Sequence, residues 1–172
     1  MSFERDFAAL QQMTAELKDY LLSDVAFWPL GGSSRFPRLS LGRYLLTRAR
    51  LAADAGHAAE VANLERQGDQ VLAQWPAAAE RKAEQEFHTR LHLWETYLAE
   101  RQGRYATEVA QRAMLALLLR RFPALAGTAA GQRLAALDTA LKARLRPGAF
   151  VWEAGLEAAF PAEAFWFLYG AP

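Results

Sequence analysis

Alanine and leucine dominate this chain, and this choice of residues limits the folds that it can form. The sequence contains 36 Ala and 26 Leu, against 5 Val and no Ile. Alanine and leucine are strong helix formers, whereas β-sheets favour the β-branched residues that are scarce here. We therefore expect an all-α protein. The 172 residues are enough to bury a sizeable core, and we expect one helical domain over residues 1–172.

The spacing of apolar residues predicts an antiparallel bundle of five or six main helices with short connections. In residues 3–26 an apolar stripe recurs at alternating intervals of four and three, which places it on one face. The expected helices run from Phe3, after an N-cap at Ser2, to Ala26; from an N-cap at Ser40 to near Gly56; from there to Trp75; from Pro76 to about Gln102; from Tyr105 to Arg121; and from an N-cap at Thr128 to Pro147-Gly148.

A loop with large apolar side chains interrupts this pattern at residues 26–40, AFWPLGGSSRFPRLS. A proline and two glycines end the helix, and Phe27, Trp28 and Leu30 then need cover. We expect Phe27 and Trp28 to fold over the open end of the bundle, beside the aromatic C-terminal tail. An exposed patch would instead mark a surface for a partner or for self-association. The stretch LGGSSR is expected to be a flexible linker, with a small anion-binding nest as the alternative.

The last 24 residues, AFVWEAGLEAAFPAEAFWFLYGAP, contain four Phe, two Trp and one Tyr. Pro161 suits a first helical turn and Gly170 a helix end, which predicts a short final helix between them. The apolar side chains from Phe165 to Tyr169 lie on several sides of that helix and require a cover. We expect this aromatic-rich segment to pack on the bundle as a plug across its end.

The net charge is only +1, but its sign alternates along the chain. Residues 25–53 carry five arginines and no acid, and residues 109–152 carry seven bases against one acid, Asp138. Neighbouring helices can neutralise such blocks, in which case Arg43 and Arg50 lie near Asp or Glu. The alternative is an open basic face that binds an acidic partner or nucleic acid. The candidate partner-binding residues are Phe27, Trp28, Leu30, Arg35, Arg38, Arg43 and Arg50.

A ridge of histidines and carboxylates follows one side of the helix expected after Pro76, at Glu84, His88, His92 and Glu95. Histidines four residues apart on a helix point the same way and can share a metal ion. A metal-binding bundle, with or without enzymatic activity, is therefore one alternative function. Because the ridge is displaced by one residue from the apolar stripe, we favour a partly solvated face with Glu–His pairs. We expect neither a metal nor another cofactor.

Residues 51–68, LAADAGHAAEVANLERQG, resemble a helix-turn-helix, the motif that places a recognition helix in the major groove of DNA. The resemblance supports a second alternative, a nucleic-acid-associated protein that uses the arginines of residues 35–50. The stretch departs from the motif after Gly56, where His57 replaces an apolar residue. Glu60 and Glu65 on the second helix would repel phosphates.

Other kinds of chemistry have little support in the sequence. The absence of cysteine excludes disulfides, thiol catalysis and cysteine metal sites. None of the five serines lies in a nucleophile-elbow context. Neither a signal peptide nor a membrane-spanning run is visible, so we expect a cytoplasmic protein without a membrane partner. No known family with matching residues is identified, and the leading hypothesis is a non-catalytic helical protein that acts through protein–protein contacts.

Overall fold

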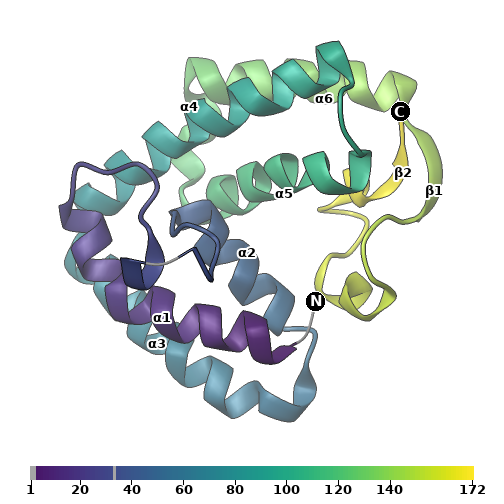
Figure 1. The fold of residues 1–172 in the computed structure, drawn as a ribbon. Helices are drawn as coiled ribbons and strands as arrows, with labels where there is room; N and C mark the ends of the chain where they lie inside the picture. Colours follow the sequence, from purple (N-terminus) through teal and green to yellow (C-terminus); the bar gives the residue numbers. More distant parts are fainter. Residues whose placement is uncertain (1–2, 33) are drawn as a thin grey trace. The chain divides into compact units, whose positions relative to one another are not determined.

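Six α-helices account for most of the residues that the structure describes, which are 3–32 and 34–172 of a computed structural model (Figure 1). The predicted all-α class and the six main helices are confirmed, while the predicted N-cap at Ser2 lies outside the described residues. The helices are α1 (Phe3–Leu22), α2 (Leu41–Leu51), α3 (Ala58–Gln74), α4 (Pro76–Glu100), α5 (Tyr105–Arg121) and α6 (Ala129–Arg144), and strands β1 (Arg146–Phe150) and β2 (Tyr169–Ala171) follow.

The chain forms two compact units, residues 1–86 and 87–172, and the division between them falls within α4. Each unit contains fully buried apolar side chains of its own. The expectation of a single domain stays a prediction. No helix among residues 3–32 and 34–172 combines the length and the apolar character needed to cross a bilayer.

In the first unit, α1 packs on both α2 and α3. The predicted apolar stripe of α1 is confirmed, because Leu10, Leu17 and Leu21 are almost completely buried. Gly68 of α3 lies directly against Tyr44 of α2, so that a Cβ atom built on Gly68 would be 1.7 Å from the Tyr44 hydroxyl oxygen. The lack of a side chain at residue 68 therefore allows α2 and α3 to approach at this point.

Two charged side chains on the first part of α4 are buried, Lys82 and Glu86. Glu86 accepts hydrogen bonds from the Ser40 hydroxyl at 2.7 Å and from the Gly42 N–H at 2.9 Å. These donors lie at the start of α2, where unpaired N–H groups and the helix dipole favour a negative charge. Ser40 is also the N-cap of α2, as predicted, because its hydroxyl accepts from the Arg43 N–H. The N-terminus of α2 is thus bound by α4.

The first helix ends four residues before Ala26, its predicted end. The N–H and the hydroxyl of Ser23 both donate to the Tyr20 carbonyl, at 3.1 and 2.7 Å, and these bonds close the last turn. The Lys82 ammonium donates to the Val25 carbonyl and lies 4.8 Å from the centre of the Tyr20 ring. Burial lowers the pKa of this amine. Because α1 has no basic residue in its last turn, Lys82 supplies positive charge near the negative end of the helix dipole.

The second helix also ends earlier than predicted, at Leu51 rather than near Gly56. Asp54 there caps a separate 3₁₀ turn, because its carboxylate accepts from the Gly56 N–H at 2.8 Å. Likewise, α6 ends at Arg144, and the Pro147-Gly148 pair lies within β1 instead of at a helix end.

In the second unit, the predicted stripe of α4 is buried, at Phe87, Leu91, Trp94 and Leu98. A largely buried ion pair joins α5 to α6, where Arg112 donates to Asp138 through two nitrogens at 2.8 and 2.7 Å. Such a bidentate pair offsets the cost of removing the arginine from water.

The aromatic C-terminal segment packs on α5, as predicted. The Tyr105 hydroxyl donates to the Phe167 carbonyl at 2.7 Å, and Trp152 Nε1 donates to the Ala106 carbonyl at 2.8 Å. Neighbouring rings of the tail meet edge to face, for example Phe160 and Phe165 with their centres 5.1 Å apart. These contacts bury large apolar surfaces within the second unit.

The tail does not form the predicted helix between Pro161 and Gly170. A turn follows Pro161, and the chain then enters a 3₁₀ helix at Trp166–Leu168 and strand β2, which pairs antiparallel with β1. Of the residues Phe165–Leu168, all but Trp166 are buried, and a helix with one buried face cannot bury consecutive residues in this way. Gly170 has a φ of 135°, and a Cβ atom there would be 2.2 Å from the Arg146 carbonyl oxygen.

Replacing Glu86 by alanine is expected to destabilise the protein by about 2–4 kcal/mol, because two buried donors at the start of α2 lose their acceptor. The matched control is Glu84→Ala, on the same helix but exposed, which should change the free energy of unfolding by less than about 0.5 kcal/mol. Urea unfolding followed by circular dichroism measures both variants. Equal effects of the two substitutions would contradict the role of Glu86.

Gly68→Ala is expected to destabilise the protein by about 1–3 kcal/mol, because the fully buried Tyr44 has no room to move away from the new methyl group. Gly155→Ala is the control, since a Cβ atom there meets no other atom within 4 Å. Thermal unfolding compares the two proteins. If both melt at the wild-type temperature, the packing of α2 on α3 is looser at this point than the structure indicates.

Candidate functional site

The loop between α1 and α2 is closed at its base by a pair of backbone hydrogen bonds. The N–H of Trp28 donates to the Leu39 carbonyl at 2.9 Å, and the N–H of Leu39 donates to the Trp28 carbonyl at 2.7 Å. Leu30 and Leu39 are buried. The loop is therefore anchored by specific contacts at Trp28, Leu30 and Leu39, and the predicted flexibility of LGGSSR stays a prediction. Ser33 lies outside the described residues.

One carboxylate of α1, Glu16, binds the middle of this loop. It accepts hydrogen bonds from Trp28 Nε1 and from the Gly31 N–H, each at 3.0 Å. Partial burial by itself raises the pKa of Glu16, but the hydrogen bonds from Trp28, Gln12 and Gly31 outweigh it and lower the pKa below its ordinary value of 4.5. The Gly31 N–H that an anion-binding nest would offer is thus bound by the chain's own carboxylate.

A cleft of about 480 Å³ lies between the start of α1 and the loop. Glu4, Arg5 and Ala8 of α1 line it together with Arg35 and Phe36 of the loop. The Arg35 guanidinium lies 5.3 Å from the centre of the Phe36 ring, which is a cation–π contact. The lining of the cleft thus combines two positive charges, one negative charge and an aromatic ring.

The seven predicted partner-binding residues differ widely in exposure. Leu30 is 1% exposed and belongs to the core, so it offers no surface to a partner. Of the others, Arg35 and Arg38 are exposed, while Phe27, Trp28, Arg43 and Arg50 are half-buried. Arg35 is the member of this set that lines the cleft. The predicted contact of Phe27 and Trp28 with the C-terminal tail stays a prediction.

The last arginine of the first basic block pairs with an acid of α1. Arg50 Nε donates to the Asp6 carboxylate at 3.1 Å, and both side chains are largely buried. This contact confirms the predicted neutralisation for Arg50. The corresponding pairing of Arg43 stays a prediction.

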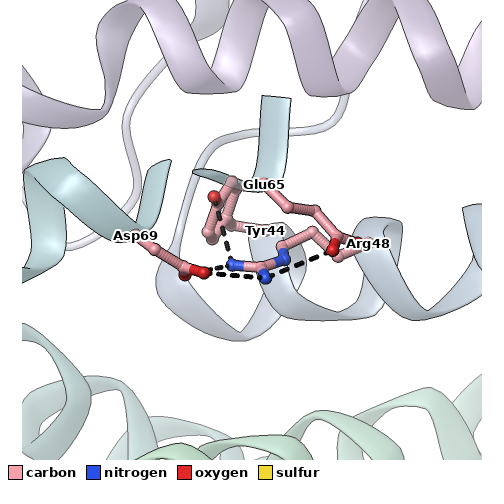
Figure 2. A network of polar contacts seen from close by, with 4 residues as sticks. All are labelled: Tyr44, Arg48, Glu65 and Asp69. Atoms are coloured by element: carbon pink, nitrogen blue, oxygen red, sulfur yellow. Dashed lines mark hydrogen bonds and ion pairs between the residues drawn. The ribbon is translucent and has the colours of Figure 1, made fainter. Parts of the chain in front are cut away.

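Arg48 is held in a polar network between α2 and α3 (Figure 2). Its guanidinium lies 2.7 Å from the Asp69 carboxylate and 3.6 Å from the Glu65 carboxylate, and Nη1 is 3.4 Å from the Tyr44 hydroxyl. Burial raises the pKa of Tyr44, although the positive charge of Arg48 opposes this effect. Glu65, which belongs to the second helix of the stretch that resembles a helix-turn-helix, therefore contributes to packing within the unit.

The histidine ridge of α4 is an exposed surface. Glu84, His88 and His92 are exposed, and Glu95 accepts from Arg133 Nε of α6 at 2.9 Å. The hydrogen bond from Arg133 lowers the pKa of Glu95. Within residues 3–32 and 34–172, no three His, Asp or Glu side chains lie close enough together to hold a metal ion.

The predicted site residues do not include Arg5, Glu16 or Phe36. Arg5 and Glu16 are ordinary polar residues on a helix, and nothing in their local spacing shows that the chain returns to Glu16 at Trp28 and Gly31 and to Arg5 at Arg35 and Phe36. Phe36 was part of a recognised aromatic loop, but its position next to Arg5 depends on how that loop folds back.

Comparisons with known protein families, with curated proteins and with solved structures find no match for this chain.

Replacing Glu16 by glutamine is expected to make the free energy of unfolding depend less on pH under acidic conditions. Because the pKa of Glu16 is lowered in the folded protein, its stabilising effect is complete above pH 4.5 and is lost as the pH falls through the folded-state pKa. Wild type should exceed Glu16→Gln in stability at pH 7, and the difference should shrink at about pH 3. Urea unfolding at several pH values measures it, with the exposed Glu84→Gln as control. A difference that is independent of pH would contradict this role of the carboxylate.

Proposed function

We propose that this protein acts by binding a protein partner, and that the cleft between α1 and the loop is its contact site. The observation that carries the proposal is the contrast between the two sides of the loop. One side is held by Glu16 through Trp28 and Gly31, while Arg35 and Phe36 are presented beside Arg5 at the cleft. Loops that a rigid scaffold positions in this way are common sites of binding.

The lining of the cleft favours an acidic segment that also carries an apolar side chain. Arg5 and Arg35 outnumber Glu4, so the net charge of the lining is positive. Arginine binds carboxylates through its fork of N–H donors, and the Phe36 ring offers an apolar surface beside that fork. Arginine and aromatic residues are also the types enriched at the centres of protein interfaces.

The two alternative functions, nucleic-acid binding by the arginines of residues 35–50 and metal binding by the histidines of α4, have less support from the contacts of these residues. The arginines of residues 35–50 would need free guanidinium groups to bind phosphates, and those of Arg48 and Arg50 are paired with carboxylates. A metal site on α4 would need a third ligand near His88 and His92, and Glu95 there is bonded to Arg133.

The proposal can be tested with short random peptides displayed on phage and selected on the immobilised full chain. The selected peptides are expected to contain Asp or Glu next to an apolar residue. For the tightest of them, made as a labelled synthetic peptide, Arg35→Ala should weaken binding about tenfold, as loss of an interface arginine commonly does. Fluorescence anisotropy measures the affinity.

The matched control is Arg38→Ala, which removes an exposed arginine of the same loop that does not line the cleft. Its affinity for the peptide should equal that of wild type. Peptides that bind wild type and Arg35→Ala equally well, or a selection without enrichment of acidic residues, would show that the cleft is not the contact site.

A further inference from the structure

The second basic block, residues 109–152, is only partly neutralised within its unit. Arg112 pairs with Asp138, and Arg133 pairs with Glu95. The other bases of the block are exposed and form no ion pair with any residue that the structure describes: Arg120, Arg121, Lys142, Arg144 and Arg146. The second unit therefore exposes five bases of this block without an ion-pair partner among the described residues, in contrast to the paired Arg48 and Arg50 of α2.

Aromatic residues of the tail lie among these bases. Lys142 Nζ of α6 is 4.8 Å from the centre of the Trp166 ring, and the Arg120 guanidinium of α5 is 5.6 Å from that of Phe165. Arg146 of β1 lies opposite Ala171 of β2. Bases from three elements thus follow the same stretch of the tail, residues 165–171. We call Arg120, Lys142, Arg146 and Trp166 the tail surface.

We propose that the tail surface binds single-stranded nucleic acid. The unpaired bases would contact successive phosphates, and the half-buried Trp166 would stack on a nucleobase. A groove with positive charge and an accessible aromatic ring is the usual combination in proteins that bind single strands. The proposal is independent of the cleft on α1, because it uses other residues of the other unit.

The arrangement of the charges favours a single strand over a duplex. Proteins that read duplex DNA commonly place one helix or strand pair in a groove, with several contact residues on that element. Here the bases come from the ends of α5 and α6 and from β1, and Arg120 and Lys142 lie over aromatic rings of the tail. Trp166, which is only half-buried, also favours a nucleic acid over an acidic protein segment, which has no base to stack.

The experiment measures binding of the full chain to a fluorescein-labelled oligothymidylate by fluorescence anisotropy over a series of salt concentrations. The triple variant Arg120→Gln/Lys142→Gln/Arg146→Gln removes the three bases of the tail surface and should bind about tenfold more weakly at low salt. The negative slope of log association constant against log salt should become smaller in magnitude by about 2. The control Arg38→Gln/Arg66→Gln/Arg81→Gln removes the same charge from exposed positions of the first unit and should keep the wild-type slope. Circular dichroism confirms that each variant is folded.

A second pair of variants tests the stacking step. Trp166→Leu should weaken binding about fivefold or more without a change in the salt slope, and Trp166→Phe should restore most of the affinity, because a phenyl ring also stacks. Three results would overturn the proposal: equal losses in the two triple variants, tighter binding to a duplex of the same length, or polyglutamate binding as tight as that of the oligonucleotide. The last result would assign the tail surface to an acidic protein partner.

Discussion

The buried carboxylate of Glu86 at the start of α2 is the interaction on which the first unit most depends. It is 2% exposed, and a charge removed from water to this extent is stable only with strong hydrogen-bond partners. Ser40 and Gly42 provide them, and the dipole of α2 adds to their effect. One turn earlier on α4, Lys82 binds the chain just after α1. The first turns of α4 therefore hold both ends of the segment that connects α1 to α2.

This arrangement explains why large apolar groups lie on a loop. The segment is bound at its two ends by α4 and in its middle by Glu16, which uses the Trp28 indole and the Gly31 N–H as donors. Trp28 is thus an anchor, and Leu30 is part of the core. Arg35 and Phe36 of the same loop form a surface at the cleft. A fixed loop loses little conformational entropy on binding, which favours affinity.

The two basic blocks of the sequence have different environments in the structure, although their compositions are alike. On α2, carboxylates of α1 and α3 lie within ion-pair distance of Arg50 and Arg48. In the second unit, the bases at the ends of α5 and α6 lie over aromatic rings, and these rings bring no negative charge that would neutralise them. A run of arginines can therefore form ion pairs within the fold or remain available for binding, and the carboxylates or aromatic rings of the neighbouring element decide between the two.

The sequence by itself determined the all-α class, the six helices, the N-caps at Ser40 and Thr128 and the main buried stripes. Helix propensity, N-capping and the spacing of apolar residues determine these features, and each of them acts over only a few neighbouring residues. It could not determine the end of α1, the strand pair that replaced the final helix, or the cleft. Each of these depends on residues far apart in the chain: Lys82 with Val25, Arg146 with Ala171, Arg5 with Arg35. Tertiary structure also decided that Glu86 is buried while Glu84 is exposed. A glutamate carboxylate is stable in water, and it is stable in the interior when buried donors such as the Ser40 hydroxyl form hydrogen bonds to it.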